Sequence, residues 1–261
     1  MAKLLFIGCG KMGGAIVRGL SGKGHEIAVV DPAKPDVGPS VLCVSSREEL
    51  PPFFSPDAVL IAVKPQAMSE VLPQYGVYKD SVFLSIAAGQ TLARLATLFG
   101  DDTRAIVRAM PNLPACVGKG ITVVLANAQV YPAQRDLCTE ILSAVGQVEW
   151  VEDEALIDPV TALSGSGPAY VFALVEAMAK AGENLGLSTD LARKLARQTV
   201  VGSGSLLETA TETAADLRVA VTSKGGTTAA ALGHLQAEDG LDALLFRAME
   251  AAARRAKELS A

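Results

Sequence analysis

The feature that most restricts the fold of this chain is a glycine loop near its N-terminus. Gly8, Gly10 and Gly13 are spaced as Gly-x-Gly-x-x-Gly, after the apolar run 3–7 and before a helical pattern over 11–21. The first glycine permits a tight turn, the second lets a ligand approach the backbone, and the third lets helix and strand pack closely. Bare N–H groups at a helix start also favour an anion. We expect a dinucleotide pyrophosphate to bind over Gly8, Cys9, Gly10, Lys11, Met12 and Gly13.

Short β-branched runs and helical patterns alternate through the first 150 residues. The expected strands are 3–7, 26–31, 41–44, 58–63, 81–86, 104–110, 120–125 and 148–151, with helices at 11–21, 68–72, 91–99 and 133–143. The run 58–63 is apolar throughout, which is typical of a strand buried on both faces. The alternation predicts a mostly parallel, doubly wound α/β sheet of the Rossmann type. We assign this dinucleotide-binding domain to residues 1–153.

The character of the chain changes after about residue 155. Alanine, leucine, glutamate and basic residues dominate, and helices are expected over 158–185 with a break near 164–168, then 189–209, 214–221, 227–236 and 240–260. Several of these helices are apolar on more than one face, which indicates burial by other helices. A helical domain of roughly 100 residues has too little mass to cover them alone. We therefore expect an all-α dimerisation domain over 154–261, covered by a second subunit.

Composition and charge exclude several classes of protein. Half of the residues are hydrophobic and a fifth are charged, so a sizeable core is available. The formal net charge is -5 and no basic stripe is visible, which argues against nucleic acid as a partner. No apolar run approaches the roughly 18 residues of a membrane span. The N-terminus enters a strand pattern at once rather than a signal peptide, so a cytoplasmic location is expected.

The four cysteines, Cys9, Cys43, Cys116 and Cys138, form no CxxC pair. They predict neither a zinc site nor a disulfide framework, and no other metal-ligand cluster is visible. We expect buried or half-buried free thiols, and no metal.

The second expected strand ends at Asp31, 18 residues after Gly13. A carboxylate at this place can bind the adenosine ribose 2′-OH, which favours NAD. Lys34 lies three residues further on and could instead pair with the 2′-phosphate of NADP. Asp31 followed by Pro32 is equally consistent with an ordinary turn. These residues leave the choice between NAD and NADP open.

Two further loops follow expected strands of the sheet. In open α/β sheets, ligands bind beyond the carboxyl ends of the strands. The first loop contains Ala62, Val63, Lys64 and Pro65, and the second contains Ala87, Ala88 and Gly89. Small residues in the second loop would let a flat ring approach the backbone, so both are candidate cofactor contacts.

Histidine is nearly absent, and this bears on the chemistry. His25 lies in a glycine loop away from the ligand edge, and His234 lies within a helical pattern. Neither is placed like the general acid and base of a hydroxy-acid dehydrogenase. A protonated imine carries positive charge before hydride arrives, whereas a ketone needs a donor for the developing alkoxide. The sequence therefore favours reduction of a C=N bond.

Two stretches of the helical half are unusual. Residues 222–228, Thr-Ser-Lys-Gly-Gly-Thr-Thr, precede a helix and offer hydroxyls, glycines and bare N–H groups to a small carboxylate. Residues 162–170 place glycine and proline within a helical pattern, where they cost stability. They suggest a kink, or a close approach to the cofactor.

These motifs resemble the pyrroline-5-carboxylate reductase family over essentially the whole chain. The resemblance rests on the glycine loop 8–14, residues 63–66, 87–89 and 108–112, and above all on 162–170 and 222–228. It implies NAD(P)H-dependent reduction of 1-pyrroline-5-carboxylate to L-proline, the last step of proline biosynthesis. It also implies a Rossmann domain and a helical domain that interlocks with its dimer partner, with larger assemblies left open.

The resemblance also implies roles for individual residues. The substrate carboxylate is expected to bind Ser223, Gly225, Gly226, Thr227 and Thr228, with Thr228 near the ring nitrogen as hydrogen-bond partner or proton donor. Glu154 and Thr161 are further candidates for substrate binding, and Met110, Pro111 and Asn112 are expected to line the nicotinamide side. Ser46 is expected to touch the adenosine, and NADP(H) is placed slightly ahead of NAD(H).

Two alternatives remain at this stage. A β-hydroxyacid or 6-phosphogluconate-type dehydrogenase would carry a catalytic lysine soon after a glycine-rich segment of its helical domain, but the first lysine after 164–168 is Lys180. A nicotinamide-binding sensor without turnover would lack any pyrroline-5-carboxylate-dependent oxidation of the cofactor.

Overall fold

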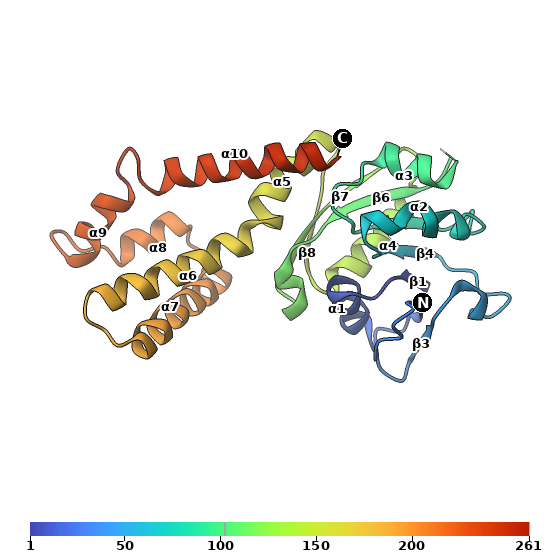
Figure 1. Ribbon diagram of the computed structural model, residues 1–261, viewed down its shortest axis with the longest axis horizontal. Coiled ribbons are helices and arrows are strands. Elements are labelled where there is room, and N and C mark those ends of the chain that lie inside the picture. The colour runs from blue at the N-terminus through green and yellow to red at the C-terminus, as the bar shows by residue number, and fades with distance from the viewer. Residues whose placement is uncertain (102, 261) are drawn as a thin grey trace. The chain divides into compact units, whose positions relative to one another are not determined.

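The computed structural model describes residues 1–101 and 103–260 and divides the chain into two compact units (Figure 1). The first unit comprises Met1–Ser166 together with the residues from Ala252 onward, and the second comprises Gly167–Ala251. Each unit is described by itself.

The first unit is built on an eight-stranded sheet with the order β3-β2-β1-β4-β5-β6-β7-β8 among the described residues. The strands are β1 (Lys3–Ile7), β2 (Glu26–Val30), β3 (Val41–Val44), β4 (Ala58–Ile61), β5 (Val82–Ser85), β6 (Ile106–Met110), β7 (Gly120–Ala126) and β8 (Gly146–Trp150). Every neighbouring pair is parallel except β6 and β7. The order of the first six strands is that of a dinucleotide-binding sheet, which confirms the predicted Rossmann-type fold.

Helices cover both faces of this sheet and create two cores. On one face, α1 (Lys11–Leu20) and α4 (Pro132–Ser143) bury Ile16, Leu20 and Ile141 against alternate strand residues such as Phe6. On the other face, α2 (Met68–Val71), the 3-10 turn Leu72–Tyr75 and α3 (Leu92–Phe99) bury Met68, Leu72, Tyr75 and Leu95. Because the central strands are covered on both faces, a strand such as β4 is apolar and buried throughout rather than alternating.

The segment that follows β8 contains the irregular stretch that glycine and proline predicted. A 3-10 turn, Glu154–Leu156, leads into α5 (Ile157–Val160) and then into a short π-helix, Thr161–Gly165. The expected break near 164–168 is therefore a change of helix type followed by α6. Single π-helical turns occur frequently at functional sites.

The second unit is all helical. It contains α6 (Gly167–Asn184), α7 (Thr189–Thr209), α8 (Ala214–Ala220), α9 (Thr227–Leu235) and the greater part of α10 (Leu241–Ser260), and α6 packs along α7 (Figure 1). Its buried side chains in the described chain are alanines: Ala179, Ala192 and Ala196. Its large apolar side chains are mostly exposed, among them Val171, Phe172, Leu174, Leu191, Leu195, Leu206, Leu207, Leu244 and Phe246. The unit thus has apolar helix faces without a core of its own to cover them.

The last helix contributes to both units. From Ala252 onward α10 belongs to the first unit, where a Cβ built on Gly89 would lie 3.0 Å from the carbonyl oxygen of Leu259. Gly89 has a φ of +70°, so glycine is required there by both conformation and space. Within the described residues, no helix is long and apolar enough to span a membrane.

The cysteines are free, and the prediction of buried or half-buried thiols holds for three of them. Cys9 and Cys138 are buried and Cys43 is half-buried. The prediction was wrong for Cys116, which is exposed because it lies in a 3-10 turn, Leu113–Val117, rather than in a strand or a packed helix. Burial raises the pKa of the Cys138 thiol to about 12, so this thiol is neutral at physiological pH.

Candidate active site

Six consecutive loops meet at one edge of the sheet. Because β1 to β6 all run parallel, the segments that follow them lie beyond the same carboxyl edge. These segments contain the glycine loop 8–13, the turn 31–34, Ser46, and the stretches 62–65, 87–89 and 110–112. The fold therefore brings all the sequence-predicted cofactor residues to a single edge, and β1 and β4 flank the point where the strand order reverses.

The glycine loop has the geometry that its spacing predicted. Gly8 has a φ of +86°, and a Cβ there would lie 2.9 Å from the carbonyl oxygen of Ala62. A Cβ on Gly13 would lie 3.1 Å from the Cβ of Ala62, so the helix packs tightly on β4. Gly10 faces open space and is the N-cap of α1, with no side chain hydrogen-bonded to the cap. Bare N–H groups and open space above them fit a pyrophosphate.

Asp31 holds the glycine loop in place. Its Oδ2 accepts a hydrogen bond from the backbone N–H of Cys9 at 2.7 Å, and its Oδ1 accepts one from Ala33 at 2.9 Å. Burial raises the pKa of the Cys9 thiol, and the Asp31 carboxylate raises it further. The thiol is therefore neutral at physiological pH, and it adds no negative charge beneath the expected pyrophosphate.

A polar cluster joins the turn after β2 to the loop after β3. Lys34, with a φ of +44°, places its Nζ 3.1 Å from Oε2 of Glu49. The Ser45 hydroxyl donates to Oε1 of Glu49, and the Ser45 N–H donates to Oε2 at 3.4 Å. Hydrogen bonds from Ser45 and then from Lys34 lower the pKa of Glu49, which stays ionised at neutral pH. Ser46, the next residue, is half-buried beside this cluster.

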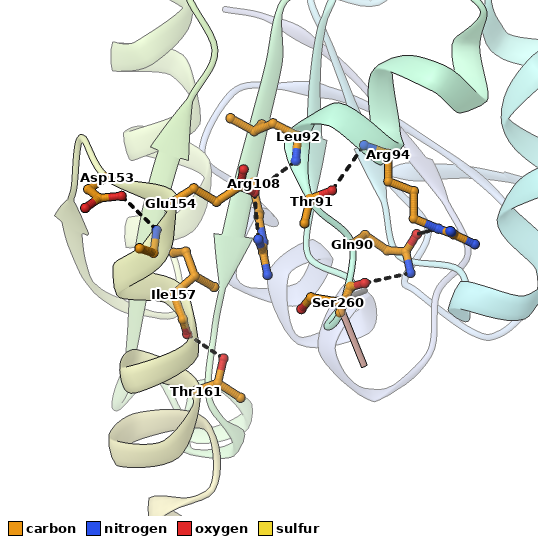
Figure 2. A network of polar contacts seen from close by, with 12 residues as sticks. Gln90, Thr91, Leu92, Arg94, Arg108, Asp153, Glu154, Ile157, Thr161 and Ser260 are labelled. Carbon is orange, nitrogen blue, oxygen red and sulfur yellow. Dashed lines mark hydrogen bonds and ion pairs between the residues drawn. The ribbon is translucent and has the colours of Figure 1, made fainter. Parts of the chain in front are cut away.

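Glu154, which follows β8, joins three segments through one carboxylate (Figure 2). Its Oε1 accepts from Nη1 of Arg108 on β6 at 2.7 Å and from the backbone N–H of Leu92 at 2.9 Å. Leu92 begins α3, directly after the loop that contains Ala87 to Gly89. The side chain of Arg108 is nearly buried, whereas about a third of the Glu154 side chain is exposed. Glu154 thus anchors the segment after β8 to the segments on the predicted nicotinamide side.

The π-helix packs on the loop after β6. Asn112 donates through Nδ2 to the Ser164 hydroxyl at 3.3 Å and accepts from the Ile121 N–H at 3.0 Å. Gly165 packs against the terminal methyl of Met110, so a larger residue there would require the methionine side chain to move. The Thr161 hydroxyl donates to the Ile157 carbonyl at 2.7 Å (Figure 2), and its oxygen remains able to accept.

The predicted carboxylate-binding loop belongs to the second unit. Gly225 has a φ of +72°, and Gly226 is the N-cap of α9 with no side chain hydrogen-bonded to the cap. The N–H groups of the first turn, which begins with Thr227 and Thr228, therefore have no capping side chain to satisfy them. The Thr222 hydroxyl donates a hydrogen bond to the backbone carbonyl oxygen of Arg218, one helical turn earlier, at 2.6 Å.

Sequence reasoning assigned no role to Glu49 or to Arg108, although Arg108 begins the stretch 108–112 that supports the resemblance. The i,i+3 and i,i+4 patterns of helices carry no signal for pairs 15 and 46 residues apart. His25 is packed, with its Nε2 3.1 Å from Oε1 of Glu140 and its side chain 2% exposed. None of the predicted site residues lines the surface pocket formed by Arg47, Glu48, residues 50–55, Val77 and Tyr78.

Comparison with known proteins identifies the family. Residues 154–259 match the family model for pyrroline-5-carboxylate reductase dimerisation, and residues 3–89 match that for NADP oxidoreductase, coenzyme F420-dependent. The pyrroline-5-carboxylate reductase of Pseudomonas aeruginosa is 39% identical over 99% of this chain and 97% of its own length.

Solved structures agree over the full length. The chain is similar to a pyrroline-5-carboxylate reductase from Coxiella burnetii, with a TM-score of 0.90 and 36% identity over 100% of this chain and 99% of that one. A Plasmodium falciparum pyrroline carboxylate reductase with NADP bound is also similar, with a TM-score of 0.83. Its identity is 29%, over 100% of this chain and 98% of that one. The chain belongs to the pyrroline-5-carboxylate reductase family.

Proposed function

We propose that this NAD(P)-dependent oxidoreductase reduces 1-pyrroline-5-carboxylate to L-proline, with the cofactor over the carboxyl edge of the sheet and the substrate carboxylate at the start of α9. The observation that carries the substrate assignment is the N-terminus of α9, where Gly226 leaves the first N–H groups without a capping side chain. Such an end binds a small carboxylate through backbone donors and the helix dipole.

The residues at the sheet edge fit a nicotinamide dinucleotide. The open space over Gly10 and the uncapped start of α1 suit its pyrophosphate. Ser46, Asp31 and Lys34 would lie toward the adenosine, while the stretches 62–65, 87–89 and 110–112 would lie toward the nicotinamide. We place NADP(H) slightly ahead of NAD(H), which is supported by the NADP bound to the Plasmodium relative.

The chemistry needs positioning more than acid catalysis. A bound reduced nicotinamide supplies a hydride to the imine carbon and is left as the oxidised cofactor. The ring nitrogen either enters protonated or gains one proton, so the C=N bond becomes an amine. The loop 223–228 holds the carboxylate and fixes which carbon faces the hydride, and such orientation supplies much of the rate. Thr228 holds the ring N–H or delivers its proton.

The assembly follows from the exposed faces of the second unit. We propose a homodimer whose helical domains, beginning at Glu154, interlock and cover apolar side chains such as Phe172, Leu195 and Phe246. The match to a dimerisation domain supports this arrangement. Each active site would then combine the sheet edge of one subunit with the loop 223–228 of its partner.

The reaction is tested by following the absorbance of NADH and of NADPH with pyrroline-5-carboxylate added. Oxidation of neither cofactor would exclude the proposed reaction and leave a nicotinamide-binding protein without turnover.

The role of Thr228 is tested in the same assay. Thr228→Ala should lower kcat by about 100-fold, the lower range for loss of a general acid, with cofactor affinity unchanged. Thr222→Ala is the matched control, because its hydroxyl is already bonded to Arg218 and kcat should be nearly unchanged. Full turnover in Thr228→Ala would exclude a chemical role for this hydroxyl.

A further inference from the structure

We infer that Glu49 is a specificity-determining residue: by pairing with Lys34 it competes with the 2′-phosphate of NADP(H) and sets the preference between the two cofactors. The inference rests on the proposed function, in which the turn after β2 faces the adenosine. It goes further in assigning the choice of cofactor to a glutamate and its partner.

The first step concerns the only two polar side chains of the turn 31–34. Both oxygens of Asp31 already accept backbone N–H groups, from Cys9 and Ala33. Asp31 is therefore a positioning residue for the glycine loop, which NAD and NADP share. Lys34 carries the positive charge of this turn, so it is the residue here that can attract a phosphate.

The second step concerns the state of Lys34. Its ammonium lies 3.1 Å from Oε2 of Glu49, and both side chains are about half exposed. The Ser45 hydroxyl and N–H hold the Glu49 carboxylate in this position. A dianionic phosphate and the carboxylate would therefore compete for the same ammonium.

The third step concerns the strength of the competition. Ion pairs as exposed as this one contribute little to stability, and salt screens them. A 2′-phosphate can therefore displace Glu49 from Lys34, but the displaced carboxylate stays within the same cluster. The pair therefore reduces the affinity for NADP(H) without abolishing binding, and it leaves the affinity for NAD(H) almost unchanged.

The test is direct binding of NADP+ and NAD+ to the full-length enzyme by titration calorimetry, with kcat/KM for NADPH and NADH as a second readout. Glu49→Gln should lower Kd for NADP+ by about 2- to 5-fold and leave Kd for NAD+ almost unchanged. Lys34→Gln should raise Kd for NADP+ by about 10-fold. Glu48→Gln removes the same charge one residue away, where no bond to Lys34 exists, and should leave the Kd ratio of the two cofactors unchanged.

The double variant separates the mechanism from a general charge effect. In the Lys34→Gln background, Glu49→Gln should no longer tighten NADP+ binding, because no ammonium remains to be released. An equal gain in that background, an equal effect of Glu48→Gln, or an unchanged ratio in Glu49→Gln would each overturn the inference. The binding readout does not require turnover, so the inference and the proposed reaction can fail separately.

Discussion

Both units of this protein contain many large apolar side chains, but they bury them to different degrees. In the first unit, β-strands and helices enclose large side chains such as Phe83 and Leu60 completely. In the second, α6 and α7 meet through alanines, while Leu195, Phe172 and Phe246 stay exposed. Burial of apolar area is the main favourable contribution to folding. We therefore expect the first unit to carry its own stability, and the stability of the second to depend on association and hence on protein concentration.

The unfolding of the two units can be followed by different spectroscopic probes. Trp150, the sole tryptophan of the sequence, ends β8 and reports on the first unit by fluorescence. Far-ultraviolet circular dichroism reports on the helices, many of which lie in the second unit.

The largest expected effect is on the core of the first unit. The Phe83 side chain is fully buried, with its ring centroid 4.3 Å from that of Phe99. Phe83→Ala should lower the free energy of unfolding by about 3–5 kcal/mol, because it removes buried apolar surface and leaves a cavity. The measurement is urea denaturation followed by Trp150 fluorescence.

Phe53→Ala provides the matched control, because this ring is 93% exposed and its loss should change stability by less than about 0.5 kcal/mol. Equal effects of the two substitutions would show that the described core does not stabilise the first unit.

The next effect tests the second unit. Leu195→Ala should weaken dimerisation by roughly 1.5–3 kcal/mol for each side chain that association buries. Sedimentation should show dissociation at higher protein concentration than for the unaltered chain, with the Trp150 transition nearly unchanged. Leu42→Ala, an exposed leucine on β3, should leave the association state unchanged. A dimer unaffected by Leu195→Ala would remove this face of α7 from the interface.

The smallest expected effect concerns the anchor of the segment after β8. Glu154→Gln should lower the free energy of unfolding by about 1–2 kcal/mol, because Arg108 is nearly buried and loses its charged partner. The value is below that of a fully buried pair, since Glu154 is about a third exposed. Glu152→Gln is the control, because its pair with Arg135 is exposed and should contribute almost nothing.

The same variant tests the substrate-binding role predicted for Glu154. Anchoring through Arg108 requires a loss of stability in the Trp150 transition. Contact with the substrate instead requires a higher KM for pyrroline-5-carboxylate at unchanged stability. The two roles therefore predict changes in different measurements, stability for anchoring and KM for substrate contact.

How much of this could be predicted from the sequence depends on how local the signal was. The glycine loop and the alternation of strands and helices could be predicted from neighbouring residues, because glycine spacing and β-branching are local signals. The break near Gly165 was visible as glycine and proline in a helical pattern, although its π-helical form was not. The pairs of Glu49 with Lys34 and of Glu154 with Arg108 were invisible, because residues far apart in sequence meet only after the strands have paired.

The return of α10 to the first unit has a consequence for biosynthesis. The first unit receives its final piece, the turns around Leu259 beside Gly89, only after the whole second unit has left the ribosome. Domains generally fold as units during synthesis, starting from the N-terminus. Here the nucleotide-binding unit emerges early but stays incomplete at the loop expected to receive the nicotinamide. The order of translation therefore delays completion of the sheet edge at Gly89 until the helices of the second unit have also been synthesised.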